Sequence, residues 1–267
     1  RMSLDTWLTP QRGTLFAIVD GAADASVVAR FYALSRGEAA PLFAGTPFAD
    51  QAAIGPWLLA NPSAAFIAEQ QCLTGFFMMS EQPLAVVRRH WQSLIQAVRE
   101  GEALWFRYAE PRVFLPVLNA MTPEERDAVL GPCHELWIDG SAFSRTPDAP
   151  FIPAEQTPWL HLRPHHLAAL YDEDRHAYIL RRRLWQIMTK MMERHPDPAA
   201  AIMPVLRQAN ADGLTDDVRE GVVAGTLTLQ AGLPLEIIRQ PLMLTDTEYA
   251  QVNHWLVQHQ TLTGVAH

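Results

Sequence analysis

The chain has 267 residues, of which 49% are hydrophobic and 19% charged, and its formal net charge is −8. Such an apolar, weakly charged composition excludes a disordered chain. The length predicts one large domain or two smaller ones. Nucleic-acid binding depends on Lys and Arg side chains that neutralise phosphates, so the acidic balance argues against that class of partner.

Targeting signals and cysteine motifs are absent from the sequence. The first twenty residues lack a basic end followed by an apolar run and a cleavage site, and no stretch of 18 apolar residues occurs. Cys72 and Cys133 stand alone without CxxC spacing, which excludes zinc-ribbon and redox motifs; one disulfide is possible but not required. We therefore expect a cytoplasmic protein that does not insert into membranes.

Several short apolar runs in the first half of the chain predict strands. The run at 15–19 closes with Asp20-Gly21, the pattern of a buried strand that ends in a turn. The segments 41–47 and 54–59 are punctuated by Gly and Pro, so they read as short strands or loops and not as helices. Further strands are expected at 73–79, 103–108 and 135–138.

Helical patterns separate these strands. Asp24 can cap a helix that continues to Leu34. Apolar residues three and four apart predict a second helix over 84–98, which stops at Glu100-Gly101. Pro116 limits any helix around it to a turn or two. Thr122-Pro-Glu-Glu125 has the cap, proline and acidic first turn of a helix start. Strands alternating with helices predict an α/β lobe with a small mixed sheet.

The second half of the chain is predicted to be all helical. Prolines interrupt residues 146–163, which favours a linker there. Beyond it, helices are expected from Pro164 with a break near 172–174, after Asp197-Pro198, from Thr215, and from Thr245 or Thr247 to His259. The predicted architecture is therefore an α/β lobe at 1–145, a proline-rich linker at 146–163 and an all-α lobe at 164–267.

The sequence carries no recognised catalytic or phosphate-binding motif. GxGxxG, GxxxxGK[ST], HExxH, GxSxG, EF-hand and deaminase signatures are all absent. His161 and His165 are four apart, but Pro164 between them starts a helix and leaves His161 outside it, so we expect no metal site. Cys133 and His134 are adjacent on a predicted strand and point to opposite faces. We predict no catalytic residue, no cofactor and no enzymatic activity.

Arginine and tryptophan offer the better clues to function. Arg181-Arg182-Arg183 is the one run of three basic residues in the sequence, and it could bind a carboxylate-rich partner. The alternative is a solvated helix face paired with the acidic residues at 172–174. Eight tryptophans suit a large core, although tryptophan is also favoured where proteins bind one another.

Four sequence blocks carry a resemblance to a known bacterial family. They are Phe16-Ala-Ile-Val-Asp-Gly-Ala22, Ala40-Pro-Leu-Phe-Ala-Gly-Thr-Pro47, Ile54-Gly-Pro-Trp-Leu58 and Trp105-Phe-Arg-Tyr-Ala-Glu-Pro-Arg-Val113. In order and spacing, residues 15–138 resemble the type VI secretion effector adaptors, also called effector chaperones. The last block departs from the family pattern, because Glu110 stands where the family usually has Asp.

The resemblance implies a non-catalytic role for this chain. Such adaptors bind a specific toxic effector in the producing cell, keep it soluble and load it onto the VgrG spike protein. On that basis we expect the cognate effector and VgrG as partners. Buried aromatics with arginine at the rim would hold them, and Trp57, Trp105, Arg107 and Arg112 are the candidate partner-binding residues. Arg107 and Arg112 could equally form a salt-bridged clamp with Glu110.

The sequence leaves two alternatives to an effector adaptor open. One is an enzyme of unrecognised motif, with His134, Glu135 or the cluster from His161 to His166 beside a cleft. The other is a scaffold that binds the spike protein only and has no toxin client.

Overall fold

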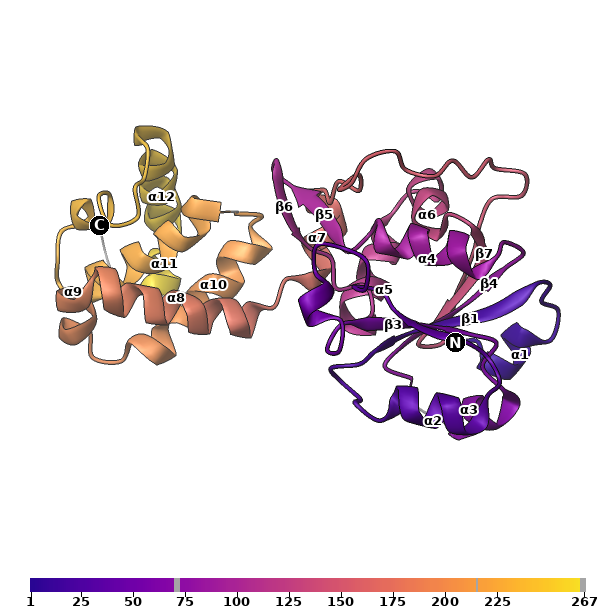
Figure 1. The fold of residues 1–267 in the computed structure, drawn as a ribbon. Coiled ribbons are helices and arrows are strands. Elements are labelled where there is room, and N and C mark those ends of the chain that lie inside the picture. The colour runs from indigo at the N-terminus through magenta and orange to yellow at the C-terminus, as the bar shows by residue number, and fades with distance from the viewer. Residues whose placement is uncertain (70–72, 215, 265–267) are drawn as a thin grey trace. The chain divides into compact units, whose positions relative to one another are not determined.

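The computed structural model of the protein describes residues 1–69, 73–214 and 216–264. It divides the chain into two compact units, residues 1–170 and 171–267 (Figure 1). The first unit combines a six-stranded sheet with helices, and the second is helical. This confirms the predicted α/β and all-α fold class. Within the described ranges, no helix is long and apolar enough to cross a membrane.

The sheet of the first unit has the strand order β2-β3-β1-β4-β7-β8. Its strands are β1 (Thr14–Asp20), β2 (Ala39–Pro41), β3 (Pro56–Ala60), β4 (Gly75–Ser80), β7 (Cys133–Ile138) and β8 (Ser141–Ser144). Every neighbouring pair is antiparallel. The sheet is therefore wholly antiparallel, and not mixed as predicted from the sequence. Alternation of strands with helices along the chain does not by itself fix strand direction, because helices can also connect antiparallel strands.

Helices cover both faces of this sheet. The helices of the first unit are α1 (Leu4–Leu8), α2 (Val27–Leu34), α3 (Ala64–Glu69), α4 (Leu84–Gln92), α5 (Pro111–Ala120), α6 (Pro123–Leu130) and α7 (Pro164–Leu167), with 3₁₀ turns at Ala49–Gln51 and Ala168–Leu170. Side chains of α4, α5 and α6 form the larger core with one sheet face, and those of α1, α2 and α3 form a second core with the other (Figure 1). Successive strand residues alternate between the two cores.

A hairpin replaces the second half of one predicted helix. α4 ends at Gln92, and β5 (Gln96–Arg99) pairs with β6 (Glu102–Trp105) across the turn at Glu100 and Gly101. Both turn residues have positive φ, +51° and +84°, which two-residue hairpin loops of the primed type require. The prediction of helix through residue 98 was therefore wrong, because Glu100-Gly101 is a hairpin turn and not a helix end.

Two proline-containing segments also differ from expectation. α5 continues through Pro116 for ten residues, because Phe114, Val117 and Leu118 pack fully into the larger core and offset the lost hydrogen bond. The predicted linker 146–163 lies within the first unit. There, Val98 N–H donates to the Leu160 carbonyl and Leu162 N–H donates to the Val98 carbonyl, each at 2.8 Å.

The second unit has its own hydrophobic core. Its helices are α8 (Glu173–Ile187), α9 (Thr189–Arg194), α10 (Pro198–Ala211), α11 (Asp216–Gln230), α12 (Asp246–Gln258) and α13 (Gln260–Thr263), with a 3₁₀ turn at Leu235–Ile238. Asp197 and Thr245 cap α10 and α12 through their side chains, as the sequence predicts. The helix start expected at Thr215 falls on a residue outside the described ranges.

Candidate partner-binding pocket

A pocket of about 340 Å³ opens in the first unit where all four sequence blocks meet. Asp20 comes from the end of β1, Phe43 from the loop after β2, and Ile54 from the segment before β3. The stretch from Trp105 to Glu110, which joins β6 to α5, supplies the remaining wall. Residues as far apart in sequence as Asp20 and Glu110 thus converge on one surface site.

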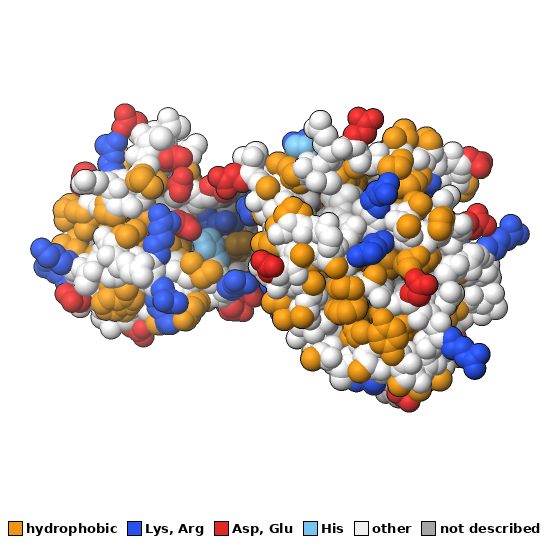
Figure 2. Space-filling model, viewed as in Figure 1, with side chains coloured by type: hydrophobic (Ala, Val, Ile, Leu, Met, Phe, Trp, Pro, Cys, Tyr) orange, Lys and Arg blue, Asp and Glu red, His pale blue; other side chains and the backbone are white. Residues whose placement is uncertain are grey.

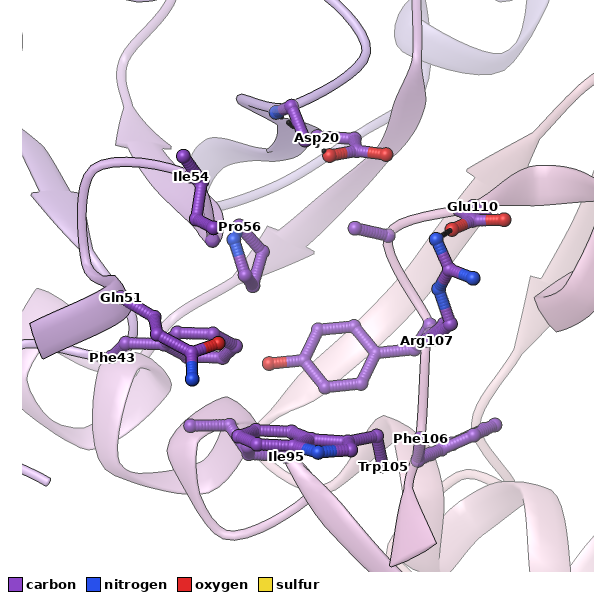
Figure 3. A pocket seen from close by; sticks show the side chains of 14 residues that line it. Asp20, Phe43, Gln51, Ile54, Pro56, Ile95, Trp105, Phe106, Arg107 and Glu110 are labelled. Atoms are coloured by element: carbon purple, nitrogen blue, oxygen red, sulfur yellow. Dashed lines mark hydrogen bonds and ion pairs between the residues drawn. The ribbon is translucent and has the colours of Figure 1, made fainter. Parts of the chain in front are cut away.

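Aromatic rings form one wall of the pocket. The Trp105 ring lies 5.4 Å from the Phe43 ring and 4.4 Å from the Phe48 ring, measured between centroids. Trp105 nevertheless remains 43% exposed and Ile54 remains 63% exposed. In Figure 3, Phe43, Ile95 and Trp105 line one side of the pocket, and Asp20 lies on the other. Exposed aromatic and aliphatic surface in a concave site is suited to an apolar side chain of a partner.

Gly55 allows the aromatic wall to form. A Cβ atom at this position would lie 2.7 Å from the Cδ2 atom of Phe43, closer than real side chains approach. The Phe43 ring therefore packs directly over the Gly55 backbone. This close approach explains why the Ile54-Gly-Pro-Trp block has glycine at its second position.

A charged group stands at the rim, next to the aromatic wall. The Glu110 carboxylate is largely buried and pairs with both Arg107 and Arg112, the latter at 3.0 Å from Nε to Oε2. The two guanidinium groups remain 67% and 81% exposed, respectively. Arg107 and Glu110 line the pocket (Figure 3). The arginines are thus oriented by Glu110 and still have donors free for a carboxylate or carbonyl of a partner.

Glu110 also explains the departure from the family pattern. It is the N-cap residue of α5, but its side chain makes no capping hydrogen bond. An Asp at this position would be short enough to accept from the first helical N–H groups. The longer Glu reaches outward to Arg107 and Arg112 instead.

Tyr108 fixes the base of the pocket. Its ring is 1% exposed, and its hydroxyl donates to the Trp91 carbonyl at 2.7 Å. Burial raises the pKa of Tyr108 well above its usual range, so the hydroxyl stays protonated. Tyr108 therefore serves as a fixed, neutral part of the pocket and of the larger core.

The structure separates Trp57 from the other three candidate residues. Trp105 and Arg107 line the pocket and Arg112 contacts its rim through Glu110. Trp57 is partly buried against the core on the opposite sheet face, formed by α1, α2 and α3. Neighbouring residues of a strand point to opposite faces, and it is Pro56 of β3 that lines the pocket.

One histidine cluster brings together groups that could hold a metal ion. Ligand atoms of Glu125, His165 and His166 lie within 4.8 Å of one another, whereas His161 is not a member. His166 Nδ1 accepts from Arg163 N–H at 2.9 Å, so Nε2 carries the proton and donates to Glu125 at 2.8 Å. These hydrogen bonds account for the cluster as a link between α6 and α7.

The other candidate catalytic groups lie apart from the pocket. Cys133 is fully buried on β7, and burial raises its pKa to about 12, which disfavours the nucleophilic thiolate. His134 and Glu135 follow on the same strand, and Glu135 accepts a hydrogen bond from Ser144. Cys72, the other cysteine, lies outside the described residues.

The pocket lies within a segment that matches a known domain family. Residues 15–128 match the family model of a domain of unknown function, DUF4123. The chain carries a DUF4123 domain. This domain contains every residue that lines the pocket, from Asp20 to Glu110. Neither a curated protein nor a solved structure matches the chain.

Proposed function

We propose that this protein is an adaptor-chaperone of type VI secretion, which binds a specific effector in the cytoplasm, keeps it soluble and loads it onto the VgrG spike. The observation that carries the proposal is the exposed aromatic pocket built from all four blocks of the family resemblance. The DUF4123 match supports it as well, since this domain is generally linked to such adaptors.

The chemistry of the pocket suits protein recognition better than catalysis. It combines an apolar wall with two oriented arginines, the combination found at binding hot spots. Its titratable groups are a carboxylate already paired with both arginines, Asp20, and a tyrosine held neutral by burial. We infer that an apolar side chain of the effector enters beside Trp105 while neighbouring polar groups of the effector meet Arg107 and Arg112.

The test is co-expression of the full chain with the effector and the VgrG protein encoded beside it. We expect a stable complex, and an effector that is soluble only when this chain is present. Trp105→Ala should raise the dissociation constant for the effector by about 30-fold, because a central aromatic anchor contributes about 2 kcal/mol. Isothermal titration with the purified proteins measures this change.

Tyr32→Ala is the matched control, because Tyr32 is an aromatic residue of similar exposure on α2, which covers the opposite sheet face. It should leave the affinity unchanged. Equal losses in both variants would show that Trp105 does not mark the binding site. Binding of VgrG without any effector would identify the chain as a spike-only scaffold, and failure to bind either protein would overturn the proposed function.

A further inference from the structure

A second surface, on α8 of the helical unit, combines exposed apolar and cationic side chains. Its members recur at helical spacing along the outer side of the helix. We call this surface the α8 stripe; it consists of Arg175, Tyr178, Ile179, Arg181, Arg182 and Trp185. All are exposed except Arg181, which is partly exposed; Tyr178 is 52% exposed and Trp185 42%. Cationic and hydrophobic side chains also lie interspersed on the visible face of this unit in Figure 2.

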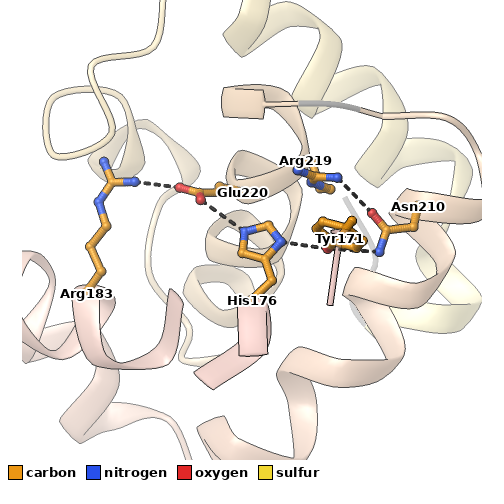
Figure 4. A network of polar contacts seen from close by, with 6 residues as sticks. All are labelled: Tyr171, His176, Arg183, Asn210, Arg219 and Glu220. Atoms are coloured by element: carbon orange, nitrogen blue, oxygen red, sulfur yellow. Dashed lines mark hydrogen bonds and ion pairs between the residues drawn. The ribbon is translucent and has the colours of Figure 1, made fainter. Parts of the chain in front are cut away.

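The inner side of α8 packs against the rest of the helical unit. Leu180 and Leu184 are buried in the core of the unit. His176 Nε2 donates to Glu220 on α11 at 3.1 Å, and Arg183 donates to the same carboxylate at 2.5 Å (Figure 4). The hydrogen bond from His176 lowers the pKa of Glu220, and the Arg183 charge adds to this effect. The helix is therefore held firmly and presents the α8 stripe as a fixed surface.

The arginines of the outer side form no ion pair within the described part of the chain. The guanidinium groups of Arg181 and Arg182 each lie 5.8 Å from the centre of the Tyr178 ring. In contrast to Arg183, neither they nor Arg175 form an ion pair with any described residue. From Arg175 to Ile187 the helix carries four arginines and no Asp or Glu. Beyond the acidic first turn of α8, which contains Glu173 and Asp174, the outer face is thus cationic in a chain whose net charge is −8.

We propose that the α8 stripe is a docking site for an acidic amphipathic helix of a partner protein. Its carboxylates would pair with Arg175, Arg181 and Arg182, and its apolar side chains would cover Tyr178, Ile179 and Trp185. Charge complementarity supports this choice. Arginines that form no ion pair with a described residue lie beside exposed apolar side chains, and this pattern matches alternating acidic and apolar side chains of a partner. The identification of this partner with the effector rests on the proposed function.

Other occupants fit the α8 stripe less well. The net charge of −8 opposes nucleic acid, which needs many phosphate contacts, and also opposes an anionic membrane. A second copy of the chain would bring acidic surface to the arginines. However, the stripe is cationic on both copies, so a symmetric contact across it would place like charges together.

The experiment uses the full chain and labelled peptides of about five helical turns, so it requires no knowledge of the effector. The probe is a peptide with Leu at helical spacing on one face and Glu on the other. One comparison peptide has the same composition in scrambled order, and another has Lys in place of Glu. Fluorescence anisotropy should give at least about tenfold tighter binding of the acidic amphipathic peptide than of either comparison peptide.

Two variants identify the surface. Arg181→Glu with Arg182→Glu should weaken binding of the acidic peptide at least about tenfold, and Trp185→Ala should weaken it to a similar extent. The matched control is Lys190→Glu with Arg194→Glu on α9, which changes the net charge equally at exposed positions of the same unit. This control should change the affinity by less than about twofold.

Several results would overturn the proposal. These are equal affinity for the three peptides, equal loss in the α8 and α9 variants, or tighter binding to vesicles of anionic lipid than to the acidic peptide. Self-association abolished by the α8 variant would assign the stripe to a second copy instead. Because the peptide readout is independent of the effector, specific peptide binding without effector binding would refute the proposed function and leave the docking site standing.

Discussion

His90 illustrates how a single residue responds to its surroundings. It is 7% exposed, its ring packs edge-on against Trp91 and Phe151, and Nε2 donates to the Val129 carbonyl at 2.6 Å. Burial is the main cause that lowers the pKa of His90 from 6.5 to about 4. The imidazole is therefore neutral in the folded protein at neutral pH.

This burial predicts a specific pH dependence of stability. Between pH 6.5 and about 4 the unfolded chain binds a proton at His90 and the folded chain does not. Above pH 6.5, neutral His90 therefore makes its full contribution to the free energy of unfolding. As the pH falls from 6.5 to about 4, this free energy decreases by about 3 kcal/mol in total. Urea unfolding at a series of pH values measures it. His90→Gln keeps a donor for Val129 and should flatten this part of the profile; an unchanged slope would contradict the assignment.

At the scale of elements, the start of α6 links two helices. Thr122 Oγ1 accepts from Glu125 N–H at 3.2 Å, and Glu125 Oε2 accepts from Thr122 N–H at 2.9 Å. The same carboxylate accepts from the buried Nε2 of His166 on α7. Although burial raises the pKa of Glu125, the hydrogen bonds from His166 and Thr122 together lower it.

This shared carboxylate predicts unequal costs for two substitutions. Thr122→Ala removes the cap of α6 and should lower the free energy of unfolding by about 1 kcal/mol. Glu125→Ala also leaves His166 without its acceptor, so the loss should reach about 2–3 kcal/mol. Glu124→Ala, an exposed acidic residue of the same turn, should change it by less than about 0.5 kcal/mol. Equal unfolding curves for the Glu124 and Glu125 variants would refute the link.

At the scale of the whole molecule, each unit has its own core, and this separation is testable. Leu206 is fully buried in the helical unit. Leu206→Ala should destabilise that unit by about 2–5 kcal/mol through a cavity. Hydrogen exchange should then accelerate in α10 and α11 and remain slow in β1 and β4 of the first unit. Ile237→Ala, at an exposed site, is the control; equal acceleration in both units would contradict separate cores.

Pairing between distant segments decided the structure of two regions that the local sequence pattern could not predict. Residues 96–99 carry a helical apolar spacing, but their hydrogen bonds to 102–105 place them in a hairpin. Prolines favoured a linker at 146–163, yet Leu160 and Leu162 are buried beside Val98 and belong to the first unit. In both cases, partners distant in sequence supply the hydrogen bonds that local propensity leaves open.

The residues of the candidate site were likewise predicted only in part. Trp105 and Arg107 were predicted from their block and line the pocket, whereas Trp57 faces the opposite core, because strand alternation sends it there. Phe43, Ile54 and Asp20 were not predicted as site residues, although their blocks were recognised. The contribution of each block to one pocket depends on how β1 and β3 pair and where the β6–α5 connection lies.

The sequence by itself determined the two fold classes and several helix starts, such as the capping box at Thr122, because periodicity and capping are local properties. Only the tertiary structure decided the antiparallel sheet, the hairpin and the meeting of four blocks at Trp105. It also showed that Arg183 pairs with Glu220 on α11, whereas Arg181 and Arg182 form no ion pair with a described residue. These features are contacts between distant segments, and their free energy exists only once the chain has folded.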